Sequence, residues 1–276
     1  MANVSPTDSG ELETVTSSDG TEIAYERTGS GPPIVLVHGA VSDRTIWEFG
    51  DVRSSVADRR TVYAMDRRGH GGSEATEPYA LEQGVDDVIA VVEAVDDPVA
   101  LLGHSSGGLY ALEAAARTDD VERLLLYEPA VAVTDDALDV ESEFEAMMSL
   151  LEDGRDEEAL VLFLEDIARI SSDEIDALRS EPTWEEQVEL VHTVPLGLGA
   201  VSAYEFDPDR YADLETPTLL LTGDESAEWF GDGIDALEAA LPNARVATMA
   251  GHGHVAQATG PERFVDEVLG FLEDAG

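Results

Sequence analysis

Short, mostly apolar runs alternate with longer segments along most of the chain. Each run is short enough for a strand that is buried on both faces. The runs are residues 33–37, 61–65, 98–102, 121–127, 217–222 and 244–249. The segments between them carry apolar residues at helical spacing, and these cover 47–57, 81–95, 109–116, 233–240 and 261–272. Apolar strands joined by helices predict an α/β protein whose sheet is mostly parallel and covered on both faces.

The first part of the chain has a different pattern. Residues 12–17 and 21–27 alternate between polar and apolar character and flank Ser18-Asp19-Gly20. An Asp-Gly pair between two such segments predicts a β-hairpin. Residues 1–10 are polar and are expected to form a disordered tail.

The pattern of apolar and polar residues changes again between residues 130 and 213. This segment contains no convincing strand, and its apolar residues recur at helical spacing. Ser171-x-x-Glu174 is typical of a capping box at a helix start. The pattern predicts a core made of residues 11–129 and 214–276, with a helical cap over 130–213. Such an insertion would lie at the carboxyl side of the sheet, where open α/β folds bind ligands.

One turn has the residues that reactive chemistry requires. Gly103-His104-Ser105-Ser106-Gly107 lies between an apolar run and a predicted helix. This strand–turn–helix context is what a nucleophile elbow needs, because a sharp turn exposes the Ser105 hydroxyl at the strand end. Gly103 and Gly107 avoid Cβ collisions across the turn. The motif alone also fits a glycine-rich connection with no chemical role.

Composition limits the partners. The 276 residues include 60 acidic and 15 basic residues, all of them arginine, for a net charge of −45. Such a charge repels nucleic acids and anionic membranes, so neither is expected as a partner. The acidic residues are spread along the chain, as in proteins of extremely halophilic archaea.

No cysteine is present, so neither a disulfide framework nor a thiolate metal site is expected. The first residues lack the basic and apolar regions of a signal peptide, and no run approaches membrane-spanning length. We therefore expect a cytoplasmic protein in a salt-rich cytoplasm.

Several motifs occur together, each at the end of a predicted strand. They are His38-Gly39-Ala40, Asp66-x-x-Gly69-x-Gly71-x-Ser73, the Gly103–Gly107 turn and Gly251-His252-Gly253-His254. In this order and spacing the chain resembles the α/β-hydrolase family from about residue 11 to its end. The resemblance implies a central eight-stranded sheet flanked by helices, with the helical cap inserted before the penultimate strand.

The resemblance also assigns roles. Ser105 corresponds to the nucleophile, and His254, in the glycine-rich loop after the last strand, to the base that removes its proton. The backbone N–H groups of Ala40 and Ser106 correspond to the oxyanion hole. His252 is expected at the rim. A metal site at His252 and His254 is disfavoured because no acidic or thiol partner recurs at ligand spacing. No metal and no cofactor is expected.

The acidic member of this triad has two candidates. Many family members place it three residues beyond a glycine after the strand 217–222, where this chain has Ser226. Asp224 lies two residues earlier. The other placement follows the preceding strand, where Glu128 stands before Pro129. Geometry favours Glu128, whose alternative role is a cap or a salt bridge to an arginine.

The predicted function is that of a carboxylesterase-like serine hydrolase that cleaves a small-molecule carboxylic ester through an acyl-enzyme. Trp47, Met147, Met148 and Phe163 are expected to line the substrate pocket. Two alternatives remain. The same triad supports cofactor-free perhydrolase (haloperoxidase-like) or carbon–carbon lyase chemistry, and the same fold supports a non-catalytic ligand receptor.

The charge generates the first testable prediction. At about 1 M salt the screening length falls to about 3 Å, which removes most of the repulsion between surface carboxylates. We expect the melting temperature to rise steeply between low and molar KCl, as measured by circular dichroism. A melting temperature that stays flat over this range would contradict the expectation.

Overall fold

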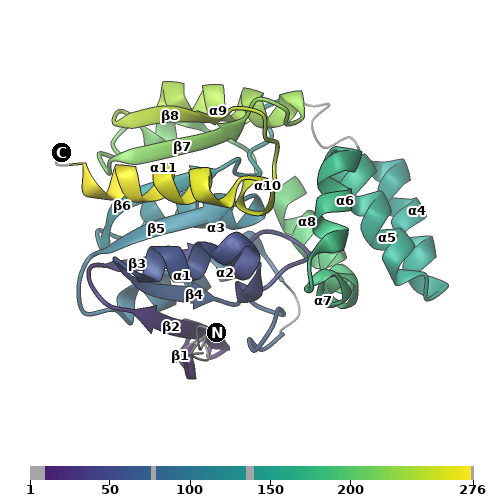
Figure 1. Cartoon of the computed structure of the whole chain (residues 1–276), viewed down its shortest axis with the longest axis horizontal. Coiled ribbons are helices and arrows are strands. Elements are labelled where there is room, and N and C mark those ends of the chain that lie inside the picture. Colours follow the sequence, from purple (N-terminus) through teal and green to yellow (C-terminus); the bar gives the residue numbers. More distant parts are fainter. Residues whose placement is uncertain (1–9, 76–78, 135–139, 275–276) are drawn as a thin grey trace, which may run out of the picture.

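The computed structural model describes residues 10–75, 79–134 and 140–274. Its core is one eight-stranded sheet in the order β1-β2-β4-β3-β5-β6-β7-β8 (Figure 1). The strands are β1 (Leu12–Thr16), β2 (Glu22–Gly29), β3 (Pro33–Val37), β4 (Thr61–Met65), β5 (Val99–His104), β6 (Val121–Tyr127), β7 (Thr218–Gly223) and β8 (Ala244–Met249). Residues 1–9, most of the expected polar tail, lie outside the described residues.

The sheet is parallel from β4 through β3 to β8, and β1 and β2 extend it as antiparallel strands. The predicted hairpin is present, with Leu12 opposite Glu26 and Thr16 opposite Glu22. All parallel strands point their carboxyl ends to the same edge. Side chains that follow β3, β5, β6 and β7 therefore meet there, although they are far apart in the sequence.

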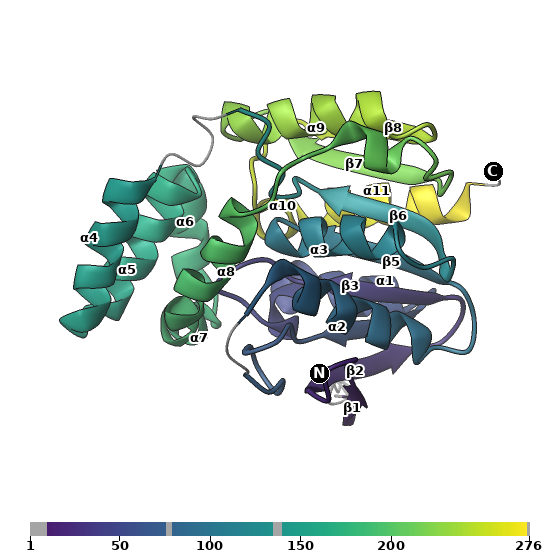
Figure 2. The ribbon, with the colours of Figure 1, turned by 180° about the vertical axis from the view of Figure 1, so that it is seen from behind.

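Helices cover both faces of the sheet, as predicted (Figures 1 and 2). One face is covered by α1 (Val52–Ala57) and α11 (Pro261–Glu273), and the other by α2 (Leu81–Glu93), α3 (Ser106–Ala115) and α9 (Glu228–Ala240). Strand β3 shows why an unbroken apolar run is required. Ile34 and Leu36 pack into one core cluster, while Val35 and Val37 pack into the other.

Between β6 and β7 the chain leaves the sheet and forms a helical insertion, within which residues 135–139 are outside the described residues. Its described part contains no strand. Its helices lie beyond the carboxyl edge of the sheet (Figures 1 and 2). They are α4 (Glu141–Glu152), α5 (Asp156–Leu162), α6 (Ser172–Ser180), α7 (Trp184–Leu190) and α8 (Val194–Ser202), with a π-helical turn at Phe163–Ile167 and 3₁₀ turns at Val191–Thr193 and Pro208–Tyr211.

The helix expected over 47–57 is interrupted. A 3₁₀ segment, Arg44–Asp51, precedes α1, and Gly50 breaks the helical geometry with φ of 52°. A Cβ at Gly50 would lie 2.2 Å from Pro261, so the break brings this loop against the start of α11. The remaining short helix, α10, covers Ala256–Thr259.

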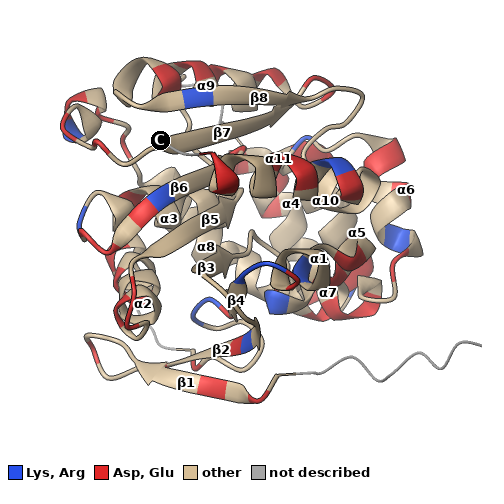
Figure 3. Cartoon of the chain, turned by 60° about the vertical axis from the view of Figure 1, so that its left-hand side comes forward, with Lys and Arg blue, Asp and Glu red and all other residues tan. Residues whose placement is uncertain are grey.

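Acidic residues are distributed over helices, strands and loops, with few basic residues between them (Figure 3). In the described ranges, no helix has both the length and the apolar character needed to cross a bilayer.

Candidate active site

Ser105 lies between β5 and α3 in a strained conformation. Its φ of 55° and ψ of −126° fall where non-glycine residues rarely occur. The backbone around it is held on both sides. Ser105 N–H donates to the Tyr127 carbonyl at 3.0 Å, and the Ser105 carbonyl accepts from Gly108 N–H at 2.9 Å and Ala130 N–H at 3.0 Å. This conformation directs the serine side chain away from the sheet and toward the carboxyl edge.

The two glycines of the turn are required by close packing. A Cβ at Gly103 would lie 2.5 Å from the Gly107 carbonyl oxygen, and a Cβ at Gly107 would lie 2.3 Å from the His38 carbonyl oxygen. Either contact is too short for any side chain. The turn therefore sits directly against the loop after β3, which carries Ala40.

His254 forms a buried hydrogen bond with Glu128. His254 Nδ1 lies 2.7 Å from Glu128 Oε2, and neither side chain is appreciably exposed. The other carboxylate oxygen accepts from Gly223 N–H at 2.7 Å and from the Thr222 hydroxyl at 3.1 Å. Glu128 itself has a positive φ of 40°. The strand ends of β6 and β7 thus hold the carboxylate, and the carboxylate orients the imidazole.

The other acidic candidate lies elsewhere. Asp224 is exposed, and its Oδ1 accepts from Gly251 N–H at 2.6 Å. This bond ties the end of β7 to the loop after β8. His252 takes no part in the contact between His254 and Glu128. Its Nδ1 lies 2.9 Å from the Thr259 hydroxyl instead.

The His254 ring is packed between two others. Its centroid lies 4.6 Å from the His104 ring and 4.0 Å from the Phe230 ring. Burial lowers the pKa of His104 well below the usual range, so His104 is neutral, and its Nε2–H donates to the His254 carbonyl at 2.9 Å. These contacts fix the plane of the His254 imidazole.

The loop that carries His254 is anchored by two residues that the sequence analysis missed as site residues. The Tyr127 hydroxyl donates to the Gly253 carbonyl and accepts from Ala256 N–H. From the helical insertion, Glu174 of α6 accepts from Val255 N–H at 3.0 Å. The Ser171-x-x-Glu174 pattern correctly predicted the cap of α6, but it carried no sign of this second contact.

The loop after β3 is held by a buried histidine. Arg67 N–H donates to His38 Nε2 at 2.9 Å, so His38 Nδ1 carries the proton and donates to the Gly39 carbonyl at 2.8 Å. Burial lowers the pKa of His38 well below the usual range, which keeps this tautomer neutral. The contacts fix the peptide that leads into Ala40.

Ser105 lies at the junction of two cavities. The first, about 60 Å³, is also lined by Ala40 and Ser106. The second, about 50 Å³, is also lined by Ala40 and His254. Phe163 lines both, at the start of the π-helical turn. The walls are largely apolar, as in small-molecule sites generally.

The other three expected pocket residues line neither cavity. Trp47 is fully buried and packs on Phe264, with ring centroids 6.4 Å apart. Met147 of α4 is fully buried in the apolar cluster that also contains Trp47, and Met148 packs against that cluster. Apolar character alone could not distinguish core from cavity here, because both demand the same residue types.

Comparison with known proteins now identifies the family. Residues 34–267 match the sequence profile of the alpha/beta hydrolase family. The chain therefore belongs to the α/β-hydrolase family, in agreement with its sheet order, its turn at Ser105 and its helical insertion.

Individual relatives align over almost the whole chain. The chain is similar to 2-(acetamidomethylene)succinate hydrolase of Mesorhizobium japonicum, with 27% identity over 257 residues that cover 89% of each protein. A solved α/β hydrolase from Sphaerobacter thermophilus is 32% identical, with a TM-score of 0.79 over 94% of this chain and 100% of that one. An esterase from Rhodococcus is 25% identical, with a TM-score of 0.76 over 96% and 99%.

The hydrogen bonds of Glu128 and Asp224 generate a prediction about the acid. Glu128→Gln removes the charge that stabilises an imidazolium, and we expect it to slow fluorophosphonate labelling of Ser105 by about 10⁴-fold. The matched change Asp224→Asn removes a charge of the same kind from the exposed loop, and labelling should stay within a few-fold of wild type. Rate constants for both are measured in molar KCl. The reverse ranking would contradict the assignment.

The contact from the helical insertion generates a second prediction. Glu174→Ala removes the acceptor of Val255 N–H, so the His254 loop loses one anchor, and a small misplacement of a base can cost about 10- to 100-fold in rate. Glu174→Gln keeps an oxygen acceptor and should retain most of the labelling rate. Equal losses in both variants would show that the charge, and not the hydrogen bond, matters.

Proposed function

We propose that this protein is a serine hydrolase that cleaves a carboxylic ester of a small molecule through an acyl-enzyme. Ser105 is the nucleophile, His254 the general base and acid, and Glu128 the residue that orients His254. Ala40 and Ser106 supply the backbone N–H donors for the oxyanion. No metal or cofactor takes part in any of these steps.

One contact carries this function: the buried 2.7 Å hydrogen bond between His254 Nδ1 and Glu128 Oε2, beside a cavity that Ser105 also lines. A carboxylate bonded to Nδ1 selects the tautomer whose Nε2 is unprotonated and able to accept a proton. A histidine that only served packing would not require a buried carboxylate as its partner.

Acylation begins when the Ser105 hydroxyl attacks the ester carbonyl and His254 Nε2 takes its proton. Within the described part of the chain Ser105 Oγ has no protein hydrogen-bond partner. The hydrogen bond between Ser105 Oγ and His254 Nε2 forms when substrate is bound, as is common for catalytic contacts that are long in unliganded sites. The Glu128 carboxylate stabilises the imidazolium that results.

The tetrahedral oxygen then lies between the N–H groups of Ala40 and Ser106. Ser106 begins α3, so the positive end of that helix also faces the developing charge. His254 returns its proton to the leaving alcohol. A water molecule, activated by the same histidine, releases the acid and restores Ser105. The two cavities beside Ser105 accommodate the two sides of the scissile bond.

The known relatives support hydrolysis. The Mesorhizobium relative is a hydrolase of 2-(acetamidomethylene)succinate, and the Rhodococcus structure is an esterase. The first name describes a hydrolase and the second an enzyme that cleaves esters, which is the reaction that we assign to this chain.

The function is tested with the protein in molar KCl. We expect a fluorophosphonate to label wild type on the peptide that contains Ser105, and p-nitrophenyl esters to be hydrolysed, with short acyl chains preferred because the cavities are small. Ser105→Ala should abolish both, whereas Ser106→Ala, which keeps the backbone N–H, should retain labelling. Absence of labelling in folded wild type would overturn the proposal and favour a ligand receptor.

A further inference from the structure

Arg67 is a buried cation directly beside the reactive serine. It follows β4, and only 4% of its surface is exposed. Its Nη1 donates to the Gly39 carbonyl at 2.8 Å and to the Ser106 hydroxyl at 2.9 Å. The Tyr110 ring lies 4.6 Å from the guanidinium carbon. All these partners are neutral groups.

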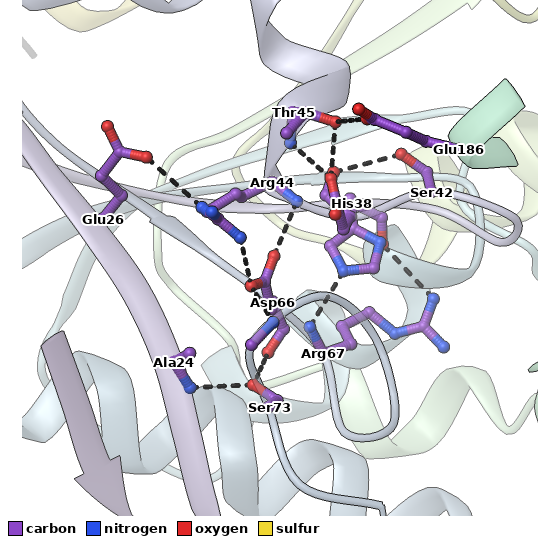
Figure 4. A network of polar contacts seen from close by, with 12 residues as sticks. Ala24, Glu26, His38, Ser42, Arg44, Thr45, Asp66, Arg67, Ser73 and Glu186 are labelled. Atoms are coloured by element: carbon purple, nitrogen blue, oxygen red, sulfur yellow. Dashed lines mark hydrogen bonds and ion pairs between the residues drawn. The ribbon is translucent and has the colours of Figure 1, made fainter. Parts of the chain in front are cut away.

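No carboxylate compensates this charge. Among the described residues none lies within 4.0 Å of the Arg67 guanidinium, and its Nε has no hydrogen-bond partner. Figure 4 shows that the neighbouring Asp66 turns to Arg44, at 2.6 Å, while Arg67 points toward the His38 loop. The next residue, Arg68, is equally buried but pairs with Asp87 at 2.7 Å.

The titratable groups around Arg67 do not supply a negative charge either. Burial raises the pKa of Tyr110, so its hydroxyl is protonated, and it accepts from the Tyr79 hydroxyl at 2.7 Å. Burial, assisted by the Arg67 charge, lowers the pKa of His70 to about 3, so that ring is neutral. A buried charge without a counter-charge is unfavourable unless a ligand provides one.

The charge faces the first cavity. Arg67 lines the same cavity as Ser105 and Ser106, and no aspartate or glutamate is among the described residues that line this cavity. In a chain with 60 acidic residues, an acid-free cavity with one permanent positive charge is a specific feature. The rest of the wall is mostly apolar, so it offers few further donors to an anion.

We infer that Arg67 binds a carboxylate carried by the substrate, so that the preferred substrates are esters with a free carboxylate, such as half-esters of short dicarboxylic acids. This inference rests on the proposed hydrolase function, because it takes the occupant of the cavity to be the ester. A guanidinium presents a planar fork that matches a carboxylate. The substrate anion supplies the counter-charge that the protein lacks.

Gly197 of α8 offers a test that leaves Arg67 and its loop in place. A Cβ built at Gly197 would lie 3.9 Å from Arg67 Nη2. Its backbone is helical, so a side chain is tolerated there. Gly197→Asp would place a carboxylate beside the guanidinium, and Gly197→Asn would place a neutral group of the same size.

The readout is selectivity between two substrates of equal shape, monomethyl glutarate and its neutral amide analogue methyl 4-carbamoylbutanoate. Wild type and Gly197→Asn should favour the anion in kcat/KM by about 10- to 100-fold, the value of a charge-assisted hydrogen bond. Gly197→Asp should abolish that preference, which is measured as the ratio of the two kcat/KM values within each variant, so that a general loss of rate cancels. Equal preference in the Asp and Asn variants would overturn the inference.

Substitution of Arg67 separates recognition from a purely structural role. Arg67→Met should remove the preference for the anion, and Arg67→Lys should restore part of it. If Arg67 only positions the Gly39–Ala40 loop, kcat would fall equally for both substrates and their ratio would not change. That result would also overturn the inference. Arg59→Met, which alters an exposed arginine paired with Glu273, controls for net charge.

Binding can be measured without turnover. In Ser105→Ala, quenching of Trp229, which lines the cavity, reports the Kd of monomethyl glutarate and of the amide analogue in molar KCl. Tighter binding of the anion, lost on adding Gly197→Asp, supports the site even if wild type hydrolyses nothing. Hydrolysis by wild type with equal Kd values would leave the proposed function standing and overturn the anion site.

Discussion

The hydrogen bond between Glu128 and His254 joins residues 126 positions apart, and the site depends on it. Glu128 directly follows β6, and its carboxylate is also held by Gly223 at the end of β7. The loop of His254 is fixed by Tyr127 from the sheet and by Glu174 from the helical insertion. A parallel sheet makes these contacts possible because its strands end at one edge. The strain at Ser105 persists because the surrounding packing leaves the turn no alternative.

The helical insertion does more than cover the sheet. Through Glu174 it contacts the backbone next to His254, and through Phe163 and Gly197 it lies against both cavities. Movement of α6 would therefore alter the position of the imidazole as well as access to Ser105. Arg67 and His38 fix the opposite side, where the Gly39 peptide leads to Ala40. The shape and charge of the cavities and the reactivity proposed for Ser105 are thus set by residues from separate segments of the chain.

The strand runs and the Gly103–Gly107 turn were predictable because each is a local pattern with a local cause. The sequence favoured Glu128 over Asp224 as the acid on geometry, but it left Asp224 open, because β6 and β7 are neighbours and both residues reach the same edge. Only hydrogen-bond geometry separates them. Trp47, placed in the pocket by its apolar character, packs on Phe264 instead. The unpaired charge of Arg67 could not be predicted from the sequence, because the absence of a counter-charge among the described residues is a property of the fold.

The most direct test of the account is proton NMR of protein labelled with ¹⁵N at histidine, recorded in molar KCl. A histidine whose Nδ1–H is hydrogen-bonded to a buried carboxylate gives a resonance far downfield of other ring protons. We expect this resonance in wild type and in Asp224→Asn, and we expect it to vanish in folded Glu128→Gln. A resonance that survives in Glu128→Gln, or that disappears in Asp224→Asn, would contradict the role given to Glu128.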